Sequence, residues 1–163
     1  MISDEFLDYV KKVENGGKAG WDEDQGLWFP HPSPEGGNDT IGYGHKLLDD
    51  EVALADAGLE DARILEMLFQ DLEKAERVAD SVVCSYYGDE YEELSDNSKC
   101  MLIDFAFNIG GGGMKKFPKF VQAVLSDDIE TMRQQYKRFY SASDGTKKEL
   151  KQRNEQFHML FLS

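Results

Sequence analysis

Turn-forming residues gather in one early segment of this chain, and that distribution limits the fold more than any other feature. Residues 16–44 hold eight of the 15 glycines and three of the four prolines, with short aromatic and β-branched pieces between them. Such a segment predicts a set of short hairpins. From Leu59 onward, apolar residues recur at intervals of three and four through Leu65, Leu72 and Val82. That spacing is typical of a long amphipathic helix.

The two patterns together predict an α+β fold, which we expect to form a single domain because a chain of 163 residues can bury a sizeable core. We expect a first helix over residues 1–14 and a small hairpin-rich N-terminal lobe over 15–58. A linking helix over 59–83 would join this lobe to a larger helical C-terminal lobe over 84–163.

Local signals predict where several helices begin and end. Ser3 can cap the first helix, and Asn15-Gly16-Gly17 follows its last turn. Ser95 can cap a very apolar core helix from about Lys99 to Ile109, which the glycine run 110–113 is expected to end. Shorter helices are expected at Pro118–Leu125, Ile129–Phe139 and Lys147–Phe161, with turn residues at 143–145.

The charge balance and the apolar runs argue against two classes of partner. With 32 acidic and 18 basic residues, the net charge is −14, which repels the phosphate backbone of nucleic acids. No apolar run approaches the ~20 residues of a membrane-spanning helix, and because residues 1–5 lack the basic and apolar regions of a secretory signal, we expect no export signal. We therefore expect no nucleic-acid binding, no membrane insertion and accumulation in the cytoplasm. The acidity also suits a saline habitat, where salt screens repulsion from anionic surfaces.

Cysteine, histidine and acidic residues give little support to a metal site. No two of the cysteines and histidines lie within four residues of each other, so no zinc site is predicted. Cys100 has apolar neighbours and is expected to behave as a small core residue rather than to join Cys84 in a disulfide. The run Asp22–Gly26 opens like a calcium loop, but Ser33 stands where the twelfth position needs glutamate. An acidic hairpin turn is therefore favoured there.

Residues 40–45 read Thr-Ile-Gly-Tyr-Gly-His, and this run closely resembles the T-I-G-x-G-H signature of the phage lysozyme family. Two more blocks match in the same order. Phe105-Ala106-Phe107-Asn108-Ile109-Gly110 resembles the core helix of that family, and Leu160-Phe161 resembles its closing helix. The resemblance covers nearly the whole chain and implies a lysozyme-like fold and a glycoside hydrolase activity.

The resemblance also implies a set of site residues. An upstream Glu, a middle Asp and the signature Thr form the catalytic set of the family, which makes Glu14 the acid and gives Thr40 a part in holding the attacking water. The position of Glu14 supports this, because partial burial and the negative end of a helix favour the protonated form of a carboxylic acid. Phe107 and Asn108 match family positions that face the glycan.

The middle Asp of the family has no direct counterpart, because Phe29-Pro30-His31-Pro32 resembles a Y-P-D-P segment with His31 in its place. Three interpretations stay open. A neutral His31 imidazole could take a proton from water. A nearby carboxylate, Glu35 or Asp39, could take that role while His31 shapes the rim. In the third interpretation no base acts, and a lytic transglycosylase forms an anhydro product.

Three other features can be compared with the family pattern. Extra residues around 18–26 should enlarge the cleft rim. The resemblance implies that His45 pairs with Asp71 in a structural bond between lobes. Of the G-L-x-x-R-R pattern near the C-terminus, only Arg153 is kept as an arginine.

The expected function is an N-acetylmuramidase that opens the β-1,4 bond between N-acetylmuramic acid and N-acetylglucosamine in bacterial peptidoglycan. A phage would use it for host cell lysis, as a monomer that needs no cofactor or metal. It would accumulate in the host cytoplasm and reach the wall through an opening made by a holin-type protein. The alternative from another class is a catalytically inactive peptidoglycan-binding module.

Overall fold

A computed structural model describes residues 2–33 and 37–163. Its contacts divide the chain into two compact units. The hairpin unit is Val10–Glu73, and the helical unit combines Met1–Tyr9 with Lys74–Ser163. The lobe boundaries expected from the sequence stay predictions.

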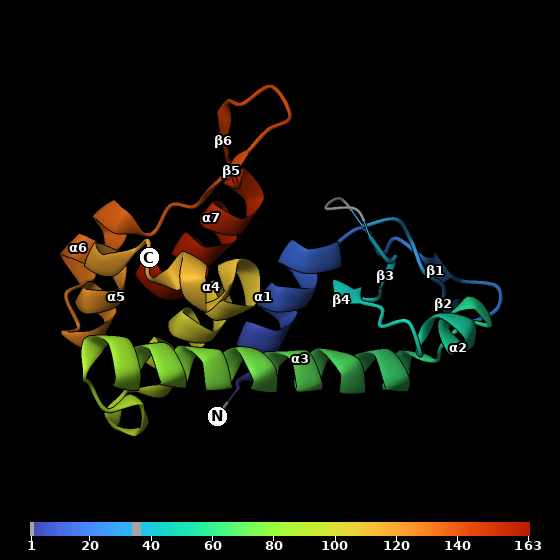
Figure 1. Cartoon of the computed structure of the whole chain (residues 1–163), viewed down its shortest axis with the longest axis horizontal. Coiled ribbons are helices and arrows are strands. Elements are labelled where there is room, and N and C mark those ends of the chain that lie inside the picture. The colour runs from blue at the N-terminus through green and yellow to red at the C-terminus, as the bar shows by residue number, and fades with distance from the viewer. Residues whose placement is uncertain (1, 34–36) are drawn as a thin grey trace. The chain divides into compact units, whose positions relative to one another are not determined.

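Helices dominate the chain, and the sheets are small (Figure 1). The α-helices are α1 (Asp4–Asn15), α2 (Val52–Asp56), α3 (Asp61–Ser81), α4 (Asp96–Met114), α5 (Pro118–Leu125), α6 (Ile129–Gln135) and α7 (Lys151–Phe157). Shorter helical turns are η1 (Val82–Tyr87), η2 (Tyr91–Glu93) and η3 (His158–Leu162). The strands pair as three antiparallel hairpins: β1 (Trp21–Asp22) with β2 (Leu27–Trp28), β3 (Thr40–Ile41) with β4 (His45–Lys46), and β5 (Phe139–Ser141) with β6 (Lys147–Glu149).

Both predicted helix caps are present. The backbone N–H of Phe6 donates to Ser3 Oγ at 3.1 Å, and that of Ser98 donates to Ser95 Oγ at 3.1 Å. The helix predicted from Leu59 is α3, which begins at Asp61. None of the described helices combines the length and apolar character that crossing a membrane requires.

The hairpin unit is built around Trp28, whose side chain is buried. Its indole packs edge-on against Tyr43, with ring centroids 5.3 Å apart, and its Nε1 donates to Asp61 Oδ1 at 3.0 Å. The backbone of Trp28 also exchanges two hydrogen bonds with Leu59. These contacts hold the predicted hairpins against the start of α3.

The helical unit has an aromatic core centred on α4. Phe105 stacks on Phe120 with centroids 4.3 Å apart and meets Phe157 edge-on at 5.8 Å. Cys100 is buried in the same helix, as predicted. Because these rings are fully covered, they supply much of the apolar burial of this unit.

The core helix breaks at Gly110, the first residue of the glycine run, as predicted, but the prediction was wrong in part because it did not include the helical turn that follows. Gly110 alone leaves the helical region, with φ 68° and ψ 177°, and the chain then forms another helical turn up to Met114. Gly111 packs against α3, where a Cβ would lie 3.2 Å from Val78 Cγ1. Glycine is free to take either conformation, so packing rather than residue type decides which glycine breaks the helix.

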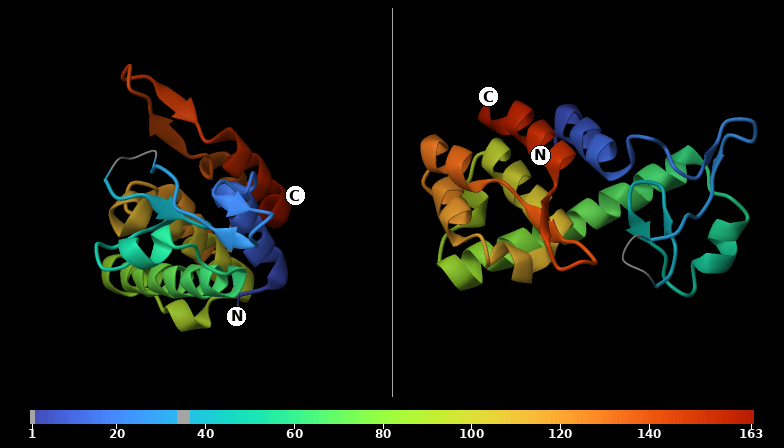
Figure 2. Two further views of the ribbon diagram at one scale, coloured as in Figure 1. Left: turned by 90° about the vertical axis from the view of Figure 1, so that its right-hand side faces the viewer. Right: turned by 90° about the horizontal axis from the view of Figure 1, so that it is seen from above.

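The predicted helices Ile129–Phe139 and Lys147–Phe161 were also wrong in part. Helix α6 ends at Gln135, and β5 and β6 form a hairpin that extends away from the helices of its own unit (Figure 1 and Figure 2). The cause is long-range: Arg138 exchanges backbone hydrogen bonds of 3.0 Å with the side-chain amide of Asn154. The turn predicted at 143–145 is present, with Gly145 at φ 81°.

Gly42→Ala is expected to lower the free energy of unfolding by about 3 kcal/mol, measured by urea denaturation. Gly42 has φ +61°, and an added Cβ would lie 2.4 Å from Ile64 Cγ2. Gly26→Ala is the matched control, since Gly26 has φ +66° but no atom within 4 Å of the added Cβ. Its loss should be only about 1 kcal/mol. Equal losses in the two variants would contradict the steric argument.

Candidate active site

Glu14 is the penultimate residue of α1, and its side chain is half-buried. The next residue, Asn15, fixes the end of this helix through three hydrogen bonds of its side chain. Its Nδ2 donates to the carbonyl oxygens of Ala19 at 3.0 Å and Gly42 at 2.9 Å, and its Oδ1 accepts from the Ala19 N–H at 2.9 Å. One amide therefore ties the acid-bearing helix end to the following loop and to the turn between β3 and β4.

The same turn faces the Glu14 carboxylate. A Cβ built on Gly44 would lie 3.1 Å from Glu14 Oε2, and Gly44 has φ +86°. A residue with a side chain would therefore be both strained and in contact with the carboxylate. The two glycines of the signature thus have separate structural roles. The absence of a side chain at Gly44 leaves space for the Glu14 carboxylate, and its absence at Gly42 leaves space for Ile64.

Thr40 and His31 lie directly opposite each other. They exchange backbone hydrogen bonds of 2.8 and 2.9 Å, and Thr40 Oγ1 lies 3.2 Å from His31 Nδ1. His31 Nε2 is buried and has no hydrogen-bond partner among the residues that the structure describes. Gly20 makes room for the imidazole, since a Cβ there would lie 3.3 Å from His31 Cδ2. Glu14, Thr40 and His31 therefore all connect to the β3–β4 hairpin.

The other predicted site residues differ in where they lie, and Asp39 directly precedes β3. Asp39 is exposed, and its carbonyl oxygen accepts from the Leu47 N–H at 3.0 Å, whereas Glu35 lies outside the described residues. Phe107 and Asn108 belong to α4 in the helical unit, and both are half-buried. Asn108 Oδ1 accepts from Arg138 Nη1 at 3.2 Å, which orients its amide.

Residues 29–156 match the model of the phage lysozyme family. The chain belongs to the phage lysozyme family. Membership confirms the predicted relationship, and with it the class of enzyme, a glycoside hydrolase.

One protein of similar sequence and one of similar structure can be compared with this member of the phage lysozyme family. Peptidoglycan hydrolase gp36 of Enterobacteria phage SP6 is 26% identical over 130 residues, which are 71% of this chain and 12% of that protein. The chain thus corresponds to a small part of that relative. The muramidase domain of SpmX from Asticaccaulis excentricus has a similar fold, with a TM-score of 0.64 and 19% identity over 100% of this chain and 98% of that one. The likeness confirms the predicted lysozyme-like α+β fold.

Two carboxylates lie within hydrogen-bond distance of His45, the signature histidine of this family member. His45 Nδ1 lies 2.7 Å from Asp71 Oδ2, as predicted, and Nε2 lies 2.9 Å from Glu51 Oε2, which the sequence did not predict. The Asp71 hydrogen bond raises the pKa of His45 although burial opposes this, and Glu51 adds to the increase. His45 and Asp71 both belong to the hairpin unit, so their bond is made within one unit rather than between the predicted lobes.

The acidic run at 22–26 forms the predicted hairpin turn between β1 and β2. The Asp22 carboxylate accepts from the backbone N–H groups of Asp24 and Gln25, each at 3.0 Å. The Gln25 hydrogen bonds are the main cause of the lowered pKa of Asp22. In the ranges 2–33 and 37–163, no group of three or more His, Cys, Asp or Glu side chains is arranged to hold a metal ion.

A buried ionic cluster in the helical unit was missed from the sequence. Asp104 Oδ2 accepts from Arg138 Nη2 at 2.6 Å and from the Tyr9 hydroxyl at 3.0 Å, and its Oδ1 accepts from Arg153 Nη1 at 2.6 Å. Burial and the nearby carboxylate raise the pKa of Tyr9, so its hydroxyl stays a donor. The available signal was an aspartate inside an otherwise apolar run, because a buried carboxylate requires partners.

Proposed function

We propose that this chain is an N-acetylmuramidase that cuts the β-1,4 bond between N-acetylmuramic acid and N-acetylglucosamine, with Glu14 as its acid. The observation that carries the proposal is the half-buried Glu14 carboxylate held against the β3–β4 turn, which Asn15 ties to the same helix end. A carboxylic acid in a fixed, partly desolvated position is what protonation of a leaving oxygen requires. The relation to a phage peptidoglycan hydrolase supports peptidoglycan as the substrate.

The chemistry assigned to these residues is hydrolysis. Glu14 gives its proton to the glycosidic oxygen as the bond from C1 to that oxygen breaks, and positive charge develops on the sugar. Water then bonds to C1 and loses a proton to a base. The Thr40 hydroxyl and the His31 imidazole lie 3.2 Å apart. In this assignment Thr40 accepts a hydrogen bond from the water, and His31 is the base that takes its proton. Phe107 and Asn108 are assigned to glycan contact.

We assign the biological role as lysis of a bacterial host by a phage, with the chain acting as a monomer on the cell wall. In that role it would accumulate in the host cytoplasm and depend on a holin-type protein for access to peptidoglycan. The relation to a phage protein supports this assignment.

Digestion of purified peptidoglycan is expected to release fragments with reducing N-acetylmuramic acid ends, identified by borohydride reduction and mass spectrometry. His31→Ala should slow this release without changing the product. Anhydro ends in the wild-type digest would mean that water does not attack and would overturn the hydrolytic assignment. Reducing N-acetylglucosamine ends would overturn the bond assignment, and a full rate in His31→Ala would remove His31 from the mechanism.

A further inference from the structure

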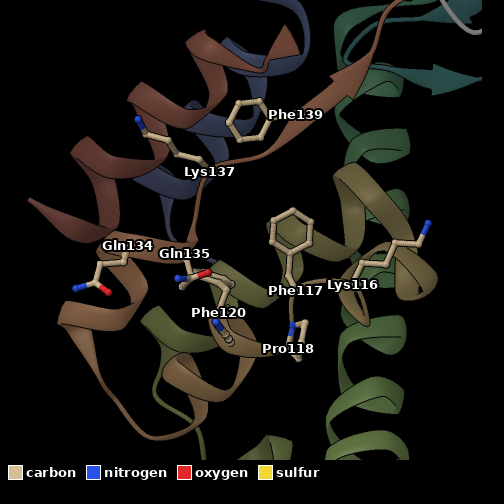
Figure 3. A pocket seen from close by; sticks show the side chains of 9 residues that line it. Lys116, Phe117, Pro118, Phe120, Gln134, Gln135, Lys137 and Phe139 are labelled. Atoms are coloured by element: carbon tan, nitrogen blue, oxygen red, sulfur yellow. The ribbon is translucent and has the colours of Figure 1, made fainter. Parts of the chain in front are cut away.

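The helical unit contains a pocket of about 570 Å³ that none of the assigned site residues lines. The start of α5, the end of α6 and the start of β5 form it (Figure 3). Its volume lies within the range of about 300–1,000 Å³ that is typical of ligand sites. The pocket is large enough for a ligand of several functional groups.

Three kinds of side chain line this pocket. Lys116, Lys119 and Lys137 carry positive charge, two glutamines provide amides, and Phe117 and Phe139 provide aromatic surface. Figure 3 shows Lys116 and Lys137 on opposite sides of the two rings. Phe139 is 52% exposed, so its ring is available to a ligand.

Only one of the three lysines of this pocket has a carboxylate partner among the described residues. No acidic residue lines it, and Lys137 reaches the Glu149 carboxylate only at 3.9 Å. Within the described part of the chain, no carboxylate forms an ion pair with Lys116 or Lys119. The ammonium groups of Lys116 and Lys119 therefore remain available for an anion.

Charge is strongly segregated along the sequence, and the pocket lies in the basic part. Residues 115–153 carry ten basic and five acidic residues, whereas residues 1–114 carry eight basic and 26 acidic residues. At physiological ionic strength the Debye length is about 8 Å, so a bound anion responds mainly to the charges near it. The pocket can therefore attract an anion although the whole chain carries −14.

From the charge and the lining chemistry, we infer that this pocket binds an acidic saccharide, a sugar that carries a carboxylate. The carboxylate pairs with the lysine ammonium groups. The C–H face of the sugar ring packs on Phe117 or Phe139, because an aromatic face is the negative part of its quadrupole. Glutamine amides donate to and accept from hydroxyl groups, which a sugar offers on several sides.

An acidic peptide is the competing ligand, and the lining favours the saccharide. A peptide offers backbone N–H groups that need carbonyl or carboxylate acceptors, and the lining side chains supply acceptors only through two glutamines. A sugar ring uses both the exposed aromatic surface and the amides. The experiment therefore compares the two ligand classes at equal charge.

Titration of the wild-type protein with trigalacturonate is expected to give saturable binding by calorimetry. Amide resonances of residues 116–120 and 134–139 should shift in the NMR spectrum. Phe139→Ala, and separately the pair Lys116→Gln and Lys119→Gln, should each weaken binding about fivefold. Increased salt should weaken binding further. A neutral N-acetylglucosamine trimer should leave these resonances unchanged.

Two control variants separate the pocket from its surroundings. Tyr140→Ala removes an exposed ring from the next position of β5, and Lys148→Gln removes a charge from β6, and neither residue lines the pocket. Both should bind trigalacturonate as the wild type does. The inference is overturned if trigalacturonate does not bind, if triaspartate binds as tightly, or if the controls weaken binding as much as the pocket variants.

Discussion

Glu14→Gln is expected to lower the rate at which the protein clears outer-membrane-stripped cells by about 10²–10⁴-fold. The substitution keeps the size of the side chain that faces Gly44 but removes the acid proton. Thermal unfolding of the variant should therefore remain cooperative, with a midpoint close to that of the wild type. The measurement is turbidity loss at matched protein concentrations.

Glu5→Gln is the matched control for this prediction. Glu5 is exposed in the first turn of the same helix, and its substitution makes the same change from a carboxyl group to an amide. Glu5→Gln should clear cells at the wild-type rate. This result would show that the slower rate of Glu14→Gln depends on the position of Glu14 and not on a change in the net charge of the protein. Equal rates in wild type and Glu14→Gln would overturn the assignment of Glu14 as the acid and would favour a binding module instead.

Asp104→Asn is expected to lower the free energy of unfolding by about 3–5 kcal/mol, the usual loss when one partner of a buried ion pair is removed. The Arg138 side chain is 0% exposed, and that of Arg153 is 7% exposed. The variant would leave two guanidinium groups close together without the carboxylate that both contact. Urea denaturation followed by circular dichroism measures the loss.

A surface ion pair of the same unit provides the comparison. Glu130 Oε1 lies 2.8 Å from Arg133 Nη1, with the two side chains 73% and 40% exposed. Glu130→Gln should lower the free energy of unfolding by no more than about 1 kcal/mol, because water and salt screen exposed pairs. A loss in Asp104→Asn as small as this would show that the buried cluster contributes little to stability.

Local signals predicted the elements whose ends depend on neighbouring residues. Ser3 and Ser95 cap helices as predicted, because a cap needs only a side-chain oxygen and a nearby N–H. The signature motif pointed to the β3–β4 hairpin. Elements decided by distant contacts were missed, and β5 is the clear case. Arg138 precedes this strand and is held by Asp104, 34 residues away, and by Asn154.

In the candidate site, too, the sequence predicted some residues but not the contacts between them. Glu14 and Thr40 could be named from the motif and its distance from a helix end, whereas the contact between His31 and Thr40 depends on pairing across a turn-rich loop. Spacing in the sequence could not show that Gly20 makes room for the His31 ring. It also could not show that Glu51 would join Asp71 at His45. Such contacts depend on how non-adjacent hairpins pack.

The three hydrogen bonds of Asn15 have a consequence for chemical ageing. Gly16 follows Asn15, and in an Asn-Gly pair the glycine nitrogen can attack the side-chain amide carbon, which releases ammonia and forms a cyclic imide. Water then opens the imide and leaves a carboxylate. That carboxylate would place an oxygen where Nδ2 now donates to the carbonyl groups of Ala19 and Gly42, so attraction would become repulsion. Deamidation at this single amide would loosen the helix end that carries Glu14. The shelf life of the protein would then depend on how firmly the folded state holds the Asn15 side chain.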